Sequence, residues 1–216
     1  HQVIKAADGY RDPMAASRSL AMMHLAMHDA ANAARPRFAH YALAAAPSPD
    51  GKADAAVAAA TAAHDVLVAL YPQPKATALA KTQLERIRLE AGIGAAIEAG
   101  AQLGKSAAAA MLTKRANDGS NGNEPYVEGT QPGQYRFTAP FNFAAAPHWR
   151  RVTPFALTSA AQFRTAPAPA LTSEQYRRDF DEVKRVGGKA STQRSSDETH
   201  YAAFWSIIAV ATCSWL

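Results

Sequence analysis

A series of alanine-rich runs, each ended by proline or glycine, constrains the fold of this chain more than any other feature. Alanine favours helix most strongly, and proline or glycine ends a helix, so each run predicts one helix. The expected helices are Met14 to Arg35, Lys52 to Tyr71, Pro74 to about Glu90 and Ala95 to Ala116. Short turns join them, which predicts an all-α fold with a four-helix bundle in residues 1–116. Because alanine buries little apolar area, close approach of the helices must stabilise this bundle.

The first of these helices shows its expected packing face most clearly. Pro13 suits its first turn, and Pro36 ends it. Apolar residues recur between them at helical spacing, which predicts the side that packs on the bundle. These residues are Leu20, Met23, Met27, Ala30, Ala31 and Ala34.

Composition excludes several classes of protein. The net charge of +5 arises from 23 basic and 18 acidic residues that are scattered along the chain, so we expect no nucleic-acid partner. No window reaches the roughly 18 apolar residues of a membrane span. The single cysteine, Cys213, cannot form an internal disulfide. A chain of 216 residues fits one domain or about half of a two-lobed protein.

Residues 117–172 lack helical periodicity and contain several prolines, glycines and aromatic residues. Such a long connection is uncommon in a compact domain unless it packs on something. We therefore expect an irregular segment that wraps across the bundle, anchored by Trp149 and Phe155. Two further helices are expected in residues 173–216. Ser173 caps one that runs through Val186, and Ser195 or Ser196 opens another that runs through Phe204-Trp205.

Stretches of this sequence, taken in order, resemble one known family. They are Met23–Ala33, Lys114–Gly119, Trp149–Leu157, Gln162–Arg164, Pro167–Leu171 and Phe204–Trp205. No single stretch is a specific motif, but their order resembles the amino-terminal half of bacterial vanadium-dependent haloperoxidase-like proteins. That family is similar in fold to the type 2 phosphatidic-acid phosphatases and bacterial acid phosphatases. The resemblance implies paired helical bundles, with an oxyanion pocket in the carboxy-terminal bundle.

The catalytic pattern of these relatives is absent here. Relatives build the pocket from a Lys, an Arg-Pro, a Ser-Gly-His segment and a later Arg with a His, which surround vanadate or phosphate with cations and backbone donors. This chain has no Ser-Gly-His, and its only Arg-Pro, Arg35-Pro36, lies in the first helical hairpin, with His28 where the Lys should be. We therefore assign no catalytic and no cofactor-binding residue. Vanadate is expected only if a carboxy-terminal half is present.

The resemblance implies an amino-terminal scaffold half of a halide-oxidising peroxidase or acid phosphatase-related protein, inactive as the isolated chain. Its partner would be a carboxy-terminal catalytic bundle, missing from this sequence, or a second chain. The resemblance also implies a bacterial protein of the periplasm or exterior, with its leader already removed.

The end of the chain departs from the relatives. Ser206 to Leu216 is apolar where relatives have a polar, glycine-containing loop. A truncation, a frame change or an imperfectly assigned tail would each explain this difference. If the tail is real, it favours association, including a homo-oligomer formed through it.

Three histidines make a candidate metal site. His24 and His28 lie four apart on one helix face, and His64 on the second helix could complete the shell together with Asp29 or Asp65. The carboxylate-bridged sites of helical bundles need Glu on two helices and Glu-x-x-His on two others, which this chain does not show. We favour the alternative that His24 and His28 are half-buried and hydrogen-bonded to backbone or carboxylates.

Other polar stretches receive structural interpretations. Asp29 and Asp65 lie in apolar helices, so each is expected to accept hydrogen bonds from a loop or to pair with an Arg. Residues 117–124 carry the oxygens of a calcium loop but lack its terminal acidic residue, so we interpret them as a turn-rich helix exit. Residues 148–151 could line an anion pocket, although a packing role for Trp149 is favoured.

Two other functions stay open. An independent helical interaction protein would use the apolar tail and the aromatic segment as a partner surface, and would bind no oxyanion. A metal-binding bundle centred on His24, His28 and His64 would hold stoichiometric metal and lose it on His24→Ala.

Overall fold

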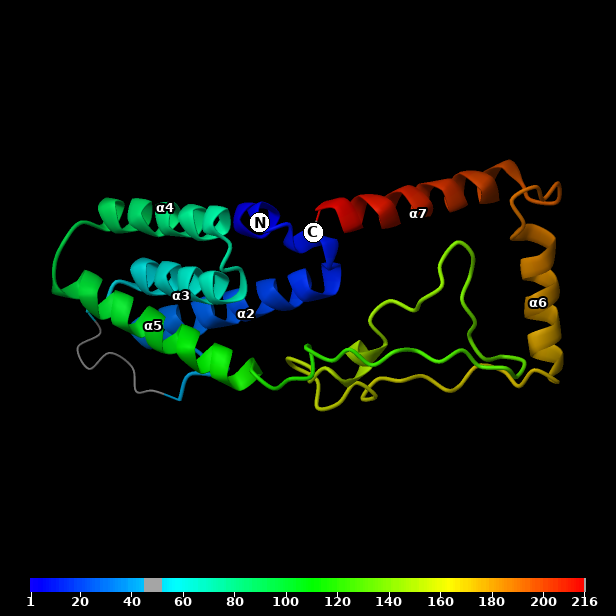
Figure 1. The fold of residues 1–216 in the computed structure, drawn as a ribbon, viewed down its shortest axis with the longest axis horizontal. Coiled ribbons are helices and arrows are strands. Elements are labelled where there is room, and N and C mark those ends of the chain that lie inside the picture. Colours follow the sequence, from blue (N-terminus) through cyan, green and yellow to red (C-terminus); the bar gives the residue numbers. More distant parts are fainter. Residues whose placement is uncertain (45–51, 216) are drawn as a thin grey trace. The chain divides into compact units, whose positions relative to one another are not determined.

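The protein is described by a computed structural model that covers residues 1–44 and 52–215, with side chains for residues 1–44 and 52–205. These ranges contain helices and no strand, which confirms the expected all-α class. Two short 3-10 helices are η1 (Gly9–Arg11) and η2 (Pro147–Arg151). The α-helices in Figure 1 are α1 (Gln2–Ala6), α2 (Pro13–Ala34), α3 (Ala55–Leu70), α4 (Pro74–Ala91), α5 (Ala95–Arg115), α6 (Glu174–Val186) and α7 (Ser196–Trp215).

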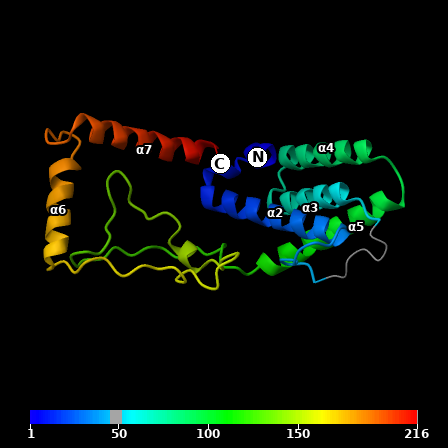
Figure 2. The same ribbon diagram turned by 180° about the vertical axis from the view of Figure 1, so that it is seen from behind.

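The chain divides into two units, one built on residues 1–117 and one on residues 118–212, which we describe separately. In the first unit, α3 packs against α2, α4 and α5, and α2 also packs against α5. The short α1 packs against α4. Figures 1 and 2 show these helices side by side from opposite directions. Helix α3 is therefore the central element of the bundle.

Side-chain caps define where the first helices begin. Asp12 accepts the backbone N–H groups of Met14 at 3.1 Å and Ala15 at 2.9 Å, with Pro13 as the first residue of α2. Asp54 accepts the N–H of Val57 at 2.8 Å. Because Asp54 is this cap, α3 begins at Ala55 and not at Lys52, where the sequence predicted it.

The break between α4 and α5 lies at the two glycines that the sequence indicated. Gly92 has φ +91° and Gly94 has φ +140°, conformations that side chains other than glycine rarely adopt. The chain reverses there, which confirms the expected turn.

Two glycines of α5 allow the closest helix approach in the bundle's centre. A Cβ on Gly100 would lie 2.4 Å from the carbonyl oxygen of Asp54, and one on Gly104 would lie 2.5 Å from the carbonyl oxygen of Ala58. Alanines continue the contact around Gly104, since Ala58, Ala107 and Ala108 are almost fully buried. The bundle is thus stabilised by backbone proximity, as the alanine-rich composition predicted.

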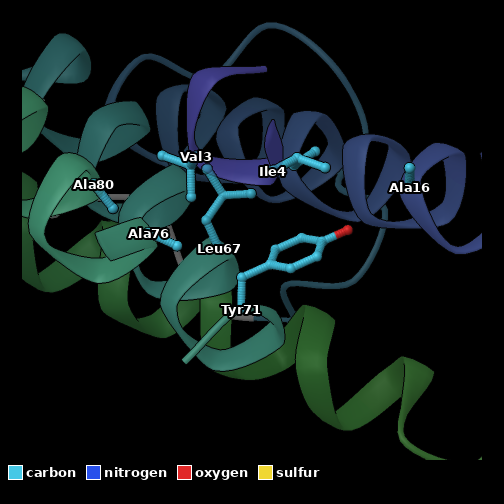
Figure 3. Close-up of a cluster of buried hydrophobic side chains, with 7 residues drawn as sticks. All are labelled: Val3, Ile4, Ala16, Leu67, Tyr71, Ala76 and Ala80. Carbon is cyan, nitrogen blue, oxygen red and sulfur yellow. The ribbon is translucent and has the colours of Figure 1, made fainter. Parts of the chain in front are cut away.

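One buried cluster joins α1, α2, α3 and α4 at the end of the bundle where α3 ends (Figure 3). Its buried members are Val3, Ile4, Ala16, Leu67, Tyr71, Ala76 and Ala80. The Tyr71 hydroxyl donates to Ser19 Oγ at 3.0 Å, so the polar end of this ring is satisfied inside the core. Gly9 lies directly against the ring, since a Cβ there would be 2.7 Å from Tyr71 Cε1.

The packing face of α2 agrees only in part with the predicted one: Ala30 and Ala34 are buried as expected, and Leu20 and Met23 pack at the edge of a buried cluster. The fully buried positions of α2 include Ala16, Met22, Ala26, Ala30 and Ala33, while Leu20, Met23 and Met27 are only partly buried. Alanines and Met22 fill the centre because α3 and α5 approach closely, and Leu20, Met23 and Met27 lie at the edge of the contact.

The second unit has well-defined local structure, but its described side chains from residue 119 to residue 205 form no buried core. Ser173 Oγ accepts the Tyr176 N–H at 3.1 Å and begins α6, as predicted. Ser195 and Glu198 form a reciprocal capping box at the start of α7, with hydrogen bonds of 2.8 and 3.1 Å. Between residues 119 and 205, no side chain is buried.

Two predictions stay predictions. The expected wrap of residues 117–172 across the bundle concerns the placement of one unit on the other. The apolar tail from Ser206 to Leu216 lies outside the described side chains. Separately, no helix among the described residues has both the length and the apolar character needed to cross a membrane.

Candidate functional site

The polar groups of the first unit gather where the second half of α2 meets the chain that follows it. Asp29 is fully buried, and its carboxylate accepts three backbone N–H groups from Tyr41, Ala42 and Leu43 at 2.7, 2.7 and 2.9 Å. The sequence predicted hydrogen bonds from a loop as one of two alternatives, and this one is confirmed. The side chain of Asp29 therefore holds the returning chain on α2.

Asn32 extends this clamp by one helical turn, and our sequence analysis did not predict its role. Its Oδ1 accepts the N–H groups of Arg37 at 2.8 Å and Phe38 at 2.9 Å, and its Nδ2 donates to the Phe38 carbonyl at 2.6 Å. A detectable signal was present: Asn32 follows Asp29 by three residues, so both lie on one face just before the Pro36 turn.

His28 is also part of the clamp. Its Nε2 lies 3.1 Å from the carbonyl oxygen of Ala39, and its ring lies against that of Phe38 with centroids 6.2 Å apart. A carbonyl oxygen only accepts, so Nε2 must carry the hydrogen. The predicted half-buried, backbone-bonded histidine is confirmed at this position. With Nε2 donating, that nitrogen has no lone pair for a metal or for attack on phosphorus.

The histidines of the candidate metal site are not brought together. His24 is exposed, which contradicts the expectation that it is half-buried, because the close contacts of α2 lie on the opposite alanine face. His64 Nδ1 lies 2.7 Å from Asp65 Oδ1, and both side chains are partly exposed. No group of three or more His, Cys, Asp or Glu residues within the described ranges could hold a metal ion. The metal-binding hypothesis gains no support from this arrangement.

Asp65 differs from its prediction, since its partner is the adjacent His64 and neither a loop nor an arginine. His64 lines a pocket of about 300 Å³ between α1, α3 and α4. Its other lining residues are His1, Gln2, Val3, Ala63, Leu67, Leu79, Ala80 and Gln83. An imidazole oriented by a carboxylate can act as a base, but no hydroxyl or thiol nucleophile lies in this lining beside it.

The stretch after α5 is a turn held by backbone and side-chain bonds. Asp118 Oδ1 accepts the Ser120 N–H at 3.1 Å, and the Asp118 carbonyl accepts the Thr153 N–H at 2.8 Å. Glu124 forms an ion pair with Arg151. These carboxylates are occupied by protein groups, which agrees with a turn-rich helix exit in place of a calcium loop.

Residues 148–151 form η2, in which the rings of His148 and Trp149 meet edge to face with centroids 5.7 Å apart. Arg151 is engaged by Glu124, so it is not free to hold an anion. Whether Trp149 and Phe155 anchor this segment to the bundle concerns both units and stays a prediction.

A comparison with protein families decides the relationship. The family model of the vanadium chloroperoxidase N-terminal domain matches residues 3–146, well over half of the chain. The chain belongs to this family. The resemblance drawn from Met23–Ala33 and Lys114–Gly119 is confirmed, since both stretches lie inside the matched span. No curated protein and no solved structure matches the chain.

Membership in this family raises the question of whether the described residues could bind vanadate. A pocket of about 330 Å³ is lined by His28, Asn32, Arg35, Arg37 and Phe38, with Ala31 and Ala55. Both arginines are exposed, and His28 Nε2 is committed to the Ala39 carbonyl. An oxyanion centre requires several cations and backbone donors that converge in a site closed to water. These residues do not fit the group.

Proposed function

We propose that this chain is the scaffold half of a vanadium-dependent haloperoxidase-like protein and does not itself carry the oxyanion chemistry. The proposal rests on the use that the fold makes of the family-like stretches. Met23–Ala33 contains Asp29, whose carboxylate holds Tyr41, and the ammonium of Lys114 lies 5.3 Å from the centre of the Tyr41 ring. The two stretches inside the matched span thus both contact Tyr41 in the loop that follows α2.

In the second unit, too, two stretches that carry the resemblance contact each other. The carbonyl of Asp118, in the stretch Lys114–Gly119, accepts the N–H of Thr153, in the stretch Trp149–Leu157. The side chain of Asp29 and the carbonyl of Asp118, both in stretches that carry the resemblance, therefore position other parts of the backbone. A scaffold requires this use, whereas a catalytic pocket would leave polar groups free to face a ligand.

In this proposal, vanadate belongs to a carboxy-terminal catalytic half, which supplies the cations and the histidine. When bound there, vanadate would supply peroxide activation for halide oxidation, and the same type of pocket would hold the phosphate of an ester. The part of this chain would be to pack on that half and to shape its entrance.

The test is an activity assay on the purified 216-residue chain. Bromide and chloride oxidation by peroxide is measured with added vanadate, and phosphate-ester hydrolysis is measured without it. We expect no turnover above a protein-free blank in either assay. Turnover that survives repurification and is abolished by the triple variant H28Q/R35Q/R37Q would contradict the proposal, because it would place oxyanion chemistry in this chain.

A second candidate function, an independent helical interaction protein, is favoured by the exposed aromatic side chains of the second unit, such as Phe163 and Tyr201. The two functions differ in the natural gene product. The scaffold function requires a catalytic half encoded with this chain or supplied by a second chain, whereas the interaction protein requires neither.

A further inference from the structure

The second unit exposes large apolar side chains and buries none between residues 119 and 205. They are Val127, Tyr135, Phe141, Phe143, Leu157, Phe163, Leu171, Phe180, Val183, Tyr201, Phe204 and Trp205. Exposed apolar side chains mark an interaction site where several of them lie together on one face. The elements of this unit differ in how regularly such side chains line one face.

Helix α6 carries the most regular of these faces. Tyr176, Phe180 and Val183 recur at spacings of four and three residues, so they lie along one side of the helix. The rings of Tyr176 and Phe180 are stacked with centroids 6.2 Å apart. Phe180 is 54% exposed and Val183 is 67% exposed. We call these three residues the α6 stripe.

The stripe is presented by a helix that is held at both ends. Ser173 caps its start, as described above. At its end, the guanidinium of Arg194 donates to the carbonyls of Val186 at 2.9 Å, Gly188 at 3.0 Å and Lys189 at 3.3 Å. The bond to Val186 satisfies a carbonyl that the end of α6 leaves free, and the guanidinium places positive charge at the negative pole of the helix. The stripe is therefore a preformed ridge.

The charges and the length of α6 limit the kinds of partner that its stripe can bind. Its acidic residues, Glu174, Asp179, Asp181 and Glu182, are balanced by Arg177, Arg178, Lys184 and Arg185. A helix that lies on an anionic membrane surface needs a basic excess, which this helix lacks. At 13 residues it is also shorter than the three heptads that a coiled coil with a second copy requires. Anchors at this spacing are typical of a helix that lies in a groove of a folded protein.

The two sides of the stripe carry opposite charges. Lys184 lies beside it on one side and Asp179 on the other, and within the described residues neither side chain forms an ion pair. A groove that fits α6 must therefore place acidic side chains along one rim and basic ones along the other.

We infer that α6 docks by its stripe into an apolar groove on the carboxy-terminal catalytic half, with an acidic rim facing Lys184 and a basic rim facing Asp179. This inference rests on the proposed scaffold function. Chain order supports this partner: α6 begins after residue 146, where the match to the N-terminal domain ends, and so lies outside that domain.

The test compares the 216-residue chain with the natural product of the gene that encodes it. Intact mass shows whether that product carries a further half, and amide hydrogen exchange measures protection of α6 in both proteins. We expect a longer product in which α6 exchanges at least tenfold more slowly than in the 216-residue chain. A longer product with equal exchange in α6 would overturn the docking of α6 while leaving the scaffold function in place. A product of about 22.9 kDa whose α6 gains no protection from any co-purified second chain would overturn both.

Substitutions on α6 distinguish docking from general stabilisation. In the longer product, Phe180→Glu should remove the protection of α6, while Arg178→Glu on the opposite side of the helix should leave it unchanged. Lys184→Glu reverses one rim charge on an exposed residue and cannot disturb a core, and we expect it to speed exchange several-fold. Equal effects of Phe180→Glu and Arg178→Glu, or no effect of Lys184→Glu, would contradict the proposed groove.

Discussion

The carboxylate of Asp29 holds the backbone N–H of Leu43 at 2.9 Å, fourteen residues further along the chain. Leu43 is itself buried, so this bond fixes the place where the chain returns to the bundle after the Pro36 turn. With the neighbouring bonds to Tyr41 and Ala42, the buried carboxyl group of Asp29 has three backbone donors. Its role is to connect α2 with the loop, which in turn contacts Lys114 on α5.

Replacing Asp29 with alanine should destabilise the first unit strongly. Three backbone donors would lose their acceptor inside the protein, and we expect a loss of about 3–5 kcal/mol in the free energy of unfolding. Urea unfolding monitored by circular dichroism measures this loss. Asp65→Ala is the matched control, because that carboxylate is 33% exposed and bonds only to His64. The clamp would be refuted if both variants lost the same small amount.

Gly104→Ala should force α3 and α5 apart. The new Cβ would lie 2.5 Å from both the Ala58 carbonyl oxygen and Thr61 Cβ, and neither backbone nor a buried side chain can move easily. We expect a loss of about 1–3 kcal/mol, although alanine is the better helix former. Gly188→Ala serves as the control, since a Cβ there meets nothing within 4 Å. A neutral or stabilising effect of Gly104→Ala would show that the helices do not approach this closely.

Tyr71→Phe should cost about 1 kcal/mol, the typical net contribution of a buried hydrogen bond. The ring and its packing on Leu67 and Gly9 remain, so only the bond from the hydroxyl to Ser19 Oγ is lost. Thermal unfolding of Tyr71→Phe is compared with that of Tyr126→Phe, which removes an exposed bond to the Tyr135 carbonyl. If Tyr126→Phe were the more damaging variant, the core position of Tyr71 would be wrong.

The start of α7 should loosen in acid. Hydrogen bonds from the backbone and side chain of Ser195 lower the pKa of Glu198 below its ordinary value of 4.5. A carboxyl group with a lowered pKa in the folded state stabilises that state above its ordinary pKa, and the contribution disappears as the pH falls through the lowered value. Amide exchange at residues 195–199 should therefore show extra opening, beyond intrinsic exchange, at acid pH.

The matching control for this prediction is Glu198→Gln, which should make the opening at the start of α7 independent of pH between about 3 and 6. The start of α6 is an internal control, because Ser173 caps it with a hydroxyl that does not titrate in this range. Acid opening of equal size at both helices would contradict the capping box as its cause.

The helices of this chain could be predicted from sequence, and the packing face of α2 could be predicted only in part. Proline, glycine and capping residues mark the helix ends locally, so the boundaries of α2, α4 and α6 agree with expectation to within a residue. The face of α2 was predicted only in part: Ala30 and Ala34 are buried, but the prediction also weighted large apolar residues such as Met27, which is only partly buried. In this bundle the close contacts select alanine, and a hydrophobicity pattern does not distinguish a buried alanine from an exposed one.

In the candidate site, too, features with a local cause could be predicted, and features that depend on packing could not. The sequence showed that a buried aspartate such as Asp29 needs partners, which is a local electrostatic argument. It could not show that Asn32 joins the clamp or that His24 faces solvent, because both depend on which side of α2 meets the loop. The family relationship came from the order of short stretches, which needs no geometry.

The most direct test of the scaffold account is vanadate binding to the purified 216-residue chain, measured by isothermal titration calorimetry and by the ⁵¹V NMR signal of free vanadate. The account predicts no heat of binding and no loss of the free-vanadate signal at equimolar protein, since no described group of residues encloses an oxyanion. Stoichiometric binding that is lost in the H28Q/R35Q/R37Q variant would contradict it and place the oxyanion pocket at the end of α2.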